Sequence, residues 1–274
     1  MIIFPGGGYQ KVMVTKEGTK VAEHFATLGY SSFVVNYRLG PLAFMSTRSA
    51  HVGPIVNDAA AALAFVRSHC GLGADSRFGN LDASKITVCG FSAGGHLALC
   101  VCAQDGGELR DLPPKPDWAE RGGEKEVEDK PDPPPIRAML LIYPTLRSPT
   151  CWCVAGGLWV VPSLFGERGF SNSGDHCTCF GASGEAMGVL LPTLPQFVMC
   201  ATVAGDMLLP AHKHSALLVR ALEKYRGEKA GGDVRYAHGG PFYLWHGVGM
   251  HRSWTDQADK WIVEAVHKED KTTI

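Results

Sequence analysis

The sequence predicts an α/β protein whose central sheet is mostly parallel and covered by helices on both faces. Between residues 2 and 98, short apolar segments rich in β-branched residues alternate with segments whose apolar residues recur at helical spacing. Such alternation is typical of parallel strands joined by crossover helices. The 274 residues fall within the range of one large domain, so we expect a single domain over residues 1–274.

The amino-terminal part contains expected strands that are each followed by a helix. Gly29 closes the first helix as a C-cap, and Asn57 or Asp58 is expected to cap the second helix at its amino-terminal end. The expected elements are a strand at 2–4, a helix at 19–28, a strand at 32–37, a helix at 59–69, and a strand that ends at Gly90 and leads into a helix.

The carboxyl-terminal part resumes the same alternation. His212 and His214, near the start of a helix, point in different directions and are expected on the surface. The expected elements are a strand at 137–143, a strand at 195–204, a helix at 210–225, a strand at 233–237 and a closing helix at 254–266.

Two segments interrupt this pattern. Residues 104–135 contain seven prolines among charged residues, and we interpret them as a solvated surface loop. Residues 151–188 are rich in cysteine and glycine and have weak periodicity. We expect the second segment either to cap the carboxyl ends of the strands and shape a substrate pocket, or to form an ordinary irregular loop.

Charge and hydropathy exclude several classes of partner. The net charge of -1 at pH 7 provides no basic surface for nucleic acid or anionic membranes, and the longest apolar runs are too short to cross a bilayer. The first residues lack the basic region of a signal peptide, so we expect a cytoplasmic protein. Because the sequence opens directly with a strand, an N-terminal segment that carries a targeting signal could be missing.

The nine cysteines are expected to be reduced and mostly buried, since a chain of this size needs no disulfides. Two Cys-x-Cys pairs invite a zinc interpretation, but their spacing is not typical of zinc ligands. We therefore expect no metal and no cofactor. The residues concerned are Cys151, Cys153, Cys177 and Cys179, with His176 beside the second pair.

Residues 90–94, Gly-Phe-Ser-Ala-Gly, stand between the third strand and a helix. A nucleophile elbow requires this strand-turn-helix context. A side chain at Gly90 or Gly94 would collide across so tight a turn. The turn would present the Ser92 hydroxyl above the sheet edge, where the first N–H groups of the helix also point. The alternative is a glycine-rich turn without a catalytic function.

Three successive glycines, Gly6 to Gly8, follow the first strand. Their backbone can approach a ligand closely with unobstructed N–H groups, as an oxyanion hole requires. The N–H groups of Gly7 or Gly8, together with that of Ala93, would stabilise a tetrahedral oxyanion. Phosphate binding is disfavoured because no Gly-Lys-Ser/Thr follows, and a plain turn is the other alternative.

The carboxyl ends of parallel strands meet at one edge of a sheet, where ligands bind. The glycine loop, Ser92, Asp206 and His246 are all expected there, in the chain order Ser, Asp, His that is typical of α/β-hydrolases. Ser92 would attack as the nucleophile. His246 would accept and return the serine proton, and Asp206 would orient the imidazole.

A family resemblance rests on six blocks and on Trp261: Pro-Gly-Gly-Gly-Tyr at 5–9, Tyr-Arg-Leu at 37–39, Gly-Phe-Ser-Ala-Gly-Gly-His-Leu-Ala at 90–98, Tyr-Pro at 143–144, Asp-Met-Leu-Leu-Pro at 206–210 and His-Gly-Val-Gly-Met at 246–250. With these blocks the chain resembles the acetyl-xylan-esterase-like and feruloyl-esterase-like α/β-hydrolases of the BD-FAE type. The resemblance implies the α/β-hydrolase fold and carboxylic ester hydrolysis through an acyl-enzyme, without metal or cofactor.

The chain departs from that family in three places. It begins at what would be the third strand of the fold, so the antiparallel start of the sheet is absent, and both interrupting segments match poorly. In the family the catalytic histidine directly follows Gly-Gly, whereas residues 241–245 stand between Gly240 and His246. His238 is therefore a second candidate for the catalytic base.

These observations predict a serine carboxylesterase that acts on short-chain esters, and the resemblance implies acetyl esters of sugars. The expected partner is a small ester, with no nucleic acid and no membrane. One alternative is a serine peptidase of the prolyl-oligopeptidase type, although the sequence has no room for a propeller. Another is a non-catalytic ligand-binding protein, which would typically lack a member of the triad.

Overall fold

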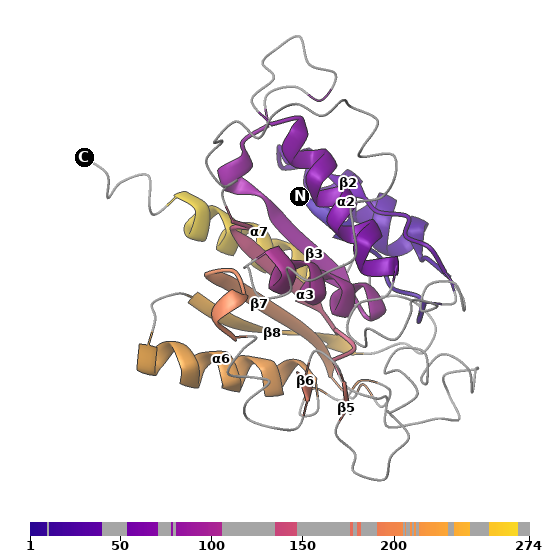
Figure 1. Cartoon of the computed structure of the whole chain (residues 1–274). Helices are drawn as coiled ribbons and strands as arrows, with labels where there is room; N and C mark the ends of the chain where they lie inside the picture. The colour runs from indigo at the N-terminus through magenta and orange to yellow at the C-terminus, as the bar shows by residue number, and fades with distance from the viewer. Residues whose placement is uncertain are drawn as a thin grey trace, which may run out of the picture.

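The computed structural model describes residues 1–9, 11–39, 54–70, 78, 81–105, 135–146, 176–177, 180–181, 191–204, 206, 209, 211, 214–229, 233–241 and 252–267. These residues form a six-stranded parallel sheet with helices on both faces (Figure 1). The predicted α/β architecture is therefore confirmed.

The order of the strands in the sheet is β2-β1-β3-β4-β7-β8. From β1 the chain first moves to one side, to β2, and then returns past β1 to β3 on its other side. The direction of winding thus reverses between β1 and β3. The strands are β1 (Ile2–Phe4), β2 (Phe33–Val34), β3 (Thr87–Phe91), β4 (Ala138–Ile142), β7 (Phe197–Ala204) and β8 (Asp233–Pro241).

Two apolar cores lie on opposite faces of the sheet because successive strand residues point to opposite sides. On one face, Phe4, Val88 and Met139 belong to a cluster that also contains residues of α2, α3 and α6. On the other face, Cys89 and Leu140 pack with residues of α1 and α7. The helices are α1 (Lys20–Thr27), α2 (Pro54–Ser68), α3 (Ala93–Asp105), α6 (Ser215–Lys229) and α7 (Arg252–His267).

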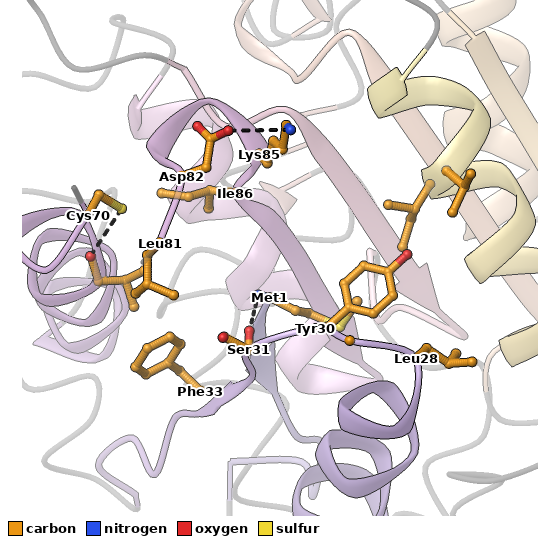
Figure 2. A pocket seen from close by; sticks show the side chains of 14 residues that line it. Met1, Leu28, Tyr30, Ser31, Phe33, Cys70, Leu81, Asp82, Lys85 and Ile86 are labelled. Atoms are coloured by element: carbon orange, nitrogen blue, oxygen red, sulfur yellow. Dashed lines mark hydrogen bonds and ion pairs between the residues drawn. The ribbon is translucent and has the colours of Figure 1, made fainter. Parts of the chain in front are cut away.

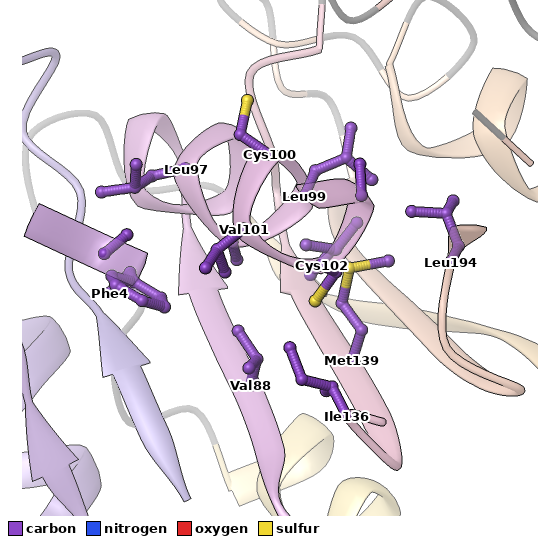
Figure 3. Close-up of a cluster of buried hydrophobic side chains, with 14 of the residues drawn as sticks. Phe4, Val88, Leu97, Leu99, Cys100, Val101, Cys102, Ile136, Met139 and Leu194 are labelled. Carbon is purple, nitrogen blue, oxygen red and sulfur yellow. The ribbon is translucent and has the colours of Figure 1, made fainter. Parts of the chain in front are cut away.

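The helix α3 lies against the sheet with its side chains buried from residue 93 to residue 103. Figure 3 shows Val101 and Cys102 of this helix directed toward Val88 and Met139 of the strands. Burying each such side chain stabilises the fold by about 1.5–3 kcal/mol. The helix that begins directly after Ser92 is thus a fixed part of the core.

The start of α2 differs from the prediction. The helix begins at Pro54, so the expected caps Asn57 and Asp58 lie inside it. Proline suits the first turn because its missing N–H would have no partner there. Asp58 instead pairs with Arg38, whose Nε and Nη2 donate to its carboxylate at 2.8 and 2.6 Å.

Four further boundaries differ from the sequence-based expectations. The strand expected at 32–37 is the two-residue β2, Phe33–Val34. A π-helix over Val14–Thr19 precedes α1. The helix α6 begins at Ser215, later than the predicted residue 210. The strand β8 continues to Pro241, so His238, Gly239 and Gly240 lie within the strand, beyond its predicted end at residue 237. Pairing with the long strand β7 over its whole length explains this extension.

Most of residues 104–135 and 151–188 lies outside the described residues. Residues 104 and 105 end α3. Within the second segment, β5 (His176–Cys177) and β6 (Phe180–Gly181) pair in antiparallel fashion. The surface-loop and cap interpretations stay predictions. None of the helices that the structure describes is long and apolar enough for a membrane span.

The cysteines whose side chains the structure describes are free thiols, in agreement with the expectation of reduced cysteines. Burial raises the pKa of the Cys200 thiol to about 12. The Cys-x-Cys pairs fall outside the residues whose side chains are described. The free cysteines are Cys89, Cys100, Cys102 and Cys200, which are buried, and Cys70, which is partly exposed.

Substitution of two glycines tests the close packing of β1 against α3. A Cβ at Gly94 would lie 2.1 Å from the carbonyl oxygen of Phe4, so we expect Gly94→Ala to lower the free energy of unfolding by about 1–3 kcal/mol. Gly227, in α6, has open space at its Cβ position, so we expect Gly227→Ala to raise the free energy of unfolding by about 0.5–1 kcal/mol. Urea denaturation measures both. A neutral Gly94→Ala would contradict the close approach.

Candidate active site

Ser92 forms the turn between β3 and α3, and its backbone has a positive φ of 49°. This left-handed conformation is strained for a residue with a Cβ. Neighbouring segments hold it in place: the Ser92 N–H donates to the Ile142 carbonyl at 3.0 Å, and the Ser92 carbonyl accepts from the Thr145 N–H at 2.9 Å. The sharp turn that the motif predicts is thus present at Ser92.

The flanking glycines are required by close backbone approaches. A Cβ at Gly90 would lie 2.4 Å from the Gly94 carbonyl oxygen. A Cβ at Gly94 would meet the carbonyl oxygens of Phe4 and Pro5 at 2.1 and 2.5 Å. No side chain fits at either position. The predicted collision across the turn is confirmed for Gly90, whereas at Gly94 the collision is with the end of β1.

The glycine loop after β1 lies beside Ser92. A Cβ built on Gly6 would lie 2.9 Å from the Cβ of Ser92. Gly7 and Gly8 have φ angles of 131° and 62°, which favour glycine. Because β1 and β3 flank the reversal of winding, their carboxyl ends border the crevice where open α/β sheets bind ligands. The structure therefore brings Ser92, Ala93 and the glycine loop together.

Hydrogen bonds hold the glycine loop on several sides. The Tyr37 hydroxyl donates to the Pro5 carbonyl, and burial raises the pKa of Tyr37, so the hydroxyl keeps its proton. The Gly6 carbonyl accepts from the Met13 N–H at 2.9 Å, and the Gly7 carbonyl accepts from the Lys11 N–H at 3.3 Å. The loop is therefore a fixed structure in spite of its glycines.

Glu17 is a site residue that the sequence analysis missed. Its carboxylate is buried, with Oε2 accepting the Gly6 N–H at 2.7 Å and Oε1 accepting the Tyr143 hydroxyl at 2.8 Å. Burial raises the pKa of Glu17, and these two hydrogen bonds oppose the rise. A glutamate beside Lys16 and before Gly18 is typical of an exposed turn, so no periodic signal marked it as buried.

Asp206 follows β7 and is buried. Its Oδ1 accepts the Leu209 N–H at 2.8 Å. Since β4 alone separates β7 from β3 in the sheet, Asp206 lies at the same carboxyl edge as Ser92. The role of Asp206 in orienting the catalytic imidazole stays a prediction.

The structure tests only some of the predictions made for the histidines. His246 lies outside the described residues. His238 lies within β8, opposite Thr202 of β7. The prediction of a surface position for His214 was wrong: the residue is 1% exposed, and its Nδ1 accepts the Leu146 N–H at 3.0 Å. A histidine near a helix start has no periodic signature of burial, and here a distant backbone N–H supplies its partner. His212 lies outside the described residues.

Comparison with known proteins confirms the resemblance drawn from the motifs. Residues 1–112, which include the glycine loop and Ser92, match the BD-FAE family model. An acetylxylan esterase of Xylanibacter ruminicola is 31% identical over 106 residues, which cover 39% of this chain. Those residues cover 19% of that protein, so the chain spans about a fifth of the length of this relative.

Solved structures resemble the chain over nearly its whole length. The carboxylesterase Cest-2923 of Lactobacillus plantarum aligns with a TM-score of 0.57 and 18% identity, over 96% of this chain and 84% of its own. Carboxyl esterase 2 of the fungus Tuber melanosporum aligns with a TM-score of 0.61 and 17% identity, over 97% of this chain and 76% of its own. This chain has the α/β-hydrolase fold.

Figure 2 shows the lining of a cavity of about 330 Å³. The cavity lies at the opposite end of the sheet from Ser92, which follows the carboxyl end of β3. Its lining includes Met1, Phe33 and Ile86, which stand at the amino ends of β1, β2 and β3. Ligands of open parallel sheets bind at the carboxyl ends. We therefore assign the candidate active site of this α/β-hydrolase fold to Ser92 and not to this cavity.

Tyr9 connects the glycine loop to the start of α3. Its hydroxyl donates to the Ala93 carbonyl at 2.8 Å and lies 2.9 Å from Nδ1 of His96, and Nε2 of His96 lies 3.7 Å from Sγ of Cys100. One consistent set of donors has His96 donating through Nδ1 and accepting the Cys100 thiol proton at Nε2. These buried groups satisfy one another and fix Ala93 relative to the loop.

Removal of one hydroxyl tests this buried chain. Tyr9→Phe leaves the Ala93 carbonyl and the His96 imidazole short of a partner, and we expect the free energy of unfolding to fall by about 1–3 kcal/mol. Tyr30→Phe is the matched control, because the Tyr30 hydroxyl donates at 3.0 Å to Asp259 in a part-buried position where water can replace it. Urea denaturation should therefore give a smaller loss for Tyr30→Phe; equal losses would argue against the buried network.

Proposed function

We propose that the chain is a serine carboxylesterase that hydrolyses short-chain esters through an acyl-enzyme. The observation that carries this proposal is the strained Ser92 turn with the glycine loop beside it. Backbone strain at a turn above a sheet edge is typical of functional sites. The match of residues 1–112 to the BD-FAE family supports the same reaction class.

In the proposed reaction, Ser92 Oγ attacks the ester carbonyl carbon while His246 accepts the hydroxyl proton. The carbonyl electrons move to oxygen, and the N–H groups of Gly7 or Gly8 and of Ala93 stabilise the oxyanion. The C–O bond to the alcohol then breaks, and the imidazolium returns its proton to the departing alkoxide. Water, deprotonated by the same histidine, then attacks the acyl carbon. The bond from that carbon to Ser92 Oγ breaks, the imidazolium returns its proton to Oγ, and the acid leaves. Asp206 orients the imidazole and stabilises its charged form.

The proposed substrates are small acyl esters, with acetyl groups on sugars as the favoured class. This proposal is supported by the acetylxylan esterase of Xylanibacter ruminicola among the relatives. The pattern of Ser, Asp and His needs neither metal nor cofactor, because an imidazole performs both proton transfers. We propose no partner other than the substrate.

Fluorophosphonate labelling read by peptide mass spectrometry tests the nucleophile. We expect the label on Ser92, and we expect Ser92→Ala to abolish it and to lower turnover of p-nitrophenyl acetate by at least about 10³-fold. Ser68→Ala is the control, since the Ser68 hydroxyl is exposed and donates to the Phe65 carbonyl of its own helix. A folded native protein that takes up no label would exclude an activated serine and favour the ligand-binding alternative.

A second pair of variants assigns the base. We expect His246→Ala to abolish labelling at Ser92, because the serine then has no group to accept its proton. His238→Ala is expected to retain most of the turnover, since His238 lies within β8 before the end of the strand. If His238→Ala abolishes labelling and turnover and His246→Ala retains them, the catalytic base is His238. Circular dichroism of both variants checks that they fold.

A further inference from the structure

Glu17 contacts both segments that border Ser92. Through Oε2 it accepts the Gly6 N–H of the glycine loop, and through Oε1 it accepts the hydroxyl of Tyr143, directly after β4. The residue is 4% exposed. Burial of a carboxylate is costly unless its oxygens are hydrogen-bonded, and here each oxygen has a donor from a different segment.

Two hydrogen bonds of Gly6, one of them to Glu17, together determine where the Gly7 N–H points. The Gly6 N–H is held by Glu17, and the Gly6 carbonyl is held by the Met13 N–H. The Gly6 carbonyl and the Gly7 N–H belong to one planar, trans peptide unit, so they point in opposite directions. Fixing both backbone groups of Gly6 therefore fixes the direction of the next donor, which is one of the two N–H groups proposed for the oxyanion.

The contact with Tyr143 connects the same carboxylate to the serine turn. Tyr143 has a φ of 37°, and its N–H donates to the Ala201 carbonyl at 2.7 Å. Two residues later the Thr145 N–H donates to the Ser92 carbonyl. Glu17 thus connects the segment that would carry the oxyanion donor to the segment that holds the nucleophile's backbone.

We propose that Glu17 is a positioning residue for ester hydrolysis, which acts by holding the Gly7 N–H at a fixed distance from Ser92 through hydrogen bonds to Gly6 and Tyr143. This proposal rests on the proposed esterase function. Glu17 touches neither the substrate nor the reacting atoms. Its contribution lies in the transition state, because the oxyanion exists only there and needs its donors already in place.

Three variants test the proposal: Glu17→Ala, Glu17→Gln and, as a control, Glu23→Ala, in which an exposed glutamate of α1 is changed. Titration with a fluorophosphonate to its end point counts the active Ser92 in each sample. Turnover of p-nitrophenyl acetate is then expressed per labelled serine, so that unfolded molecules do not contribute. This normalisation separates a positioning role from a loss of folded protein.

We expect Glu17→Ala to lower kcat per labelled serine by about 10- to 100-fold and to change KM by less than about threefold, because a displaced donor weakens transition-state binding and leaves ground-state binding intact. Glu17→Gln should recover kcat to within about fivefold of the native value, since its amide can accept from Gly6 and donate to the Tyr143 oxygen. Glu23→Ala should match the native protein.

Two results would overturn the positioning role. One is a native kcat per labelled serine in Glu17→Ala, which would make the residue merely structural. The other is a folded Glu17→Gln variant with native labelling and a kcat at least about 10-fold below native. That result would show that the hydrogen bonds of Glu17 do not explain why activity requires this residue. Failure of the proposed function itself would be distinct, since the native chain would then take up no label.

Discussion

The left-handed backbone of Ser92 is the constraint on which the arrangement around the site depends. Such a conformation costs about 1–3 kcal/mol in a residue with a Cβ and persists only where the surroundings enforce it. Here the surroundings are the hydrogen bond that Ser92 donates to the Ile142 carbonyl, the one that it accepts from the Thr145 N–H, and the first turn of α3. The glycine at 90 is a consequence of the same tight turn, which brings the Gly94 carbonyl oxygen to within 2.4 Å of its Cβ position, whereas the glycine at 94 is required by the Phe4 carbonyl oxygen of β1, 2.1 Å from its Cβ position.

The elements of the sheet were predictable because a parallel sheet covered on both faces needs strands that are apolar on both sides. β3 and β4 are buried at every position; β4 is a continuous apolar run, and Thr87 is the one polar residue of β3. The helix starts were less predictable. Asp58 carries the side chain of a cap, yet a tertiary ion pair with Arg38 uses it inside α2. A local preference of this kind is decided by contacts between segments that are distant in sequence.

The parts of the candidate site that depend on an unusual backbone conformation were predictable from the sequence. Glycine runs and the serine pentapeptide report geometry that other residues cannot adopt, so Ser92 and the glycine loop could be read from the sequence. The burial of Glu17 and His214 could not be predicted from the sequence, because a buried polar side chain depends on a partner from elsewhere in the fold. Tyr143 lies 126 residues from Glu17, and Leu146 lies 68 residues from His214. The base has two sequence candidates, and His246 lies beyond the described residues.

The hydrogen bonds around Ser92 also determine how much chain is needed to form it. Bringing distant segments together costs chain entropy before their contacts give any stabilisation. The Ser92 turn needs residues that are about 50 positions away in the sequence, so it forms together with the sheet. Residues 1–112 match the BD-FAE family, yet they contain neither Ile142 nor Thr145, which hold the serine backbone. A fragment of that length would keep the signature and lose the support that makes its turn rigid. The stretch by which the chain is recognised is therefore shorter than the smallest unit in which Ser92 can adopt its strained geometry.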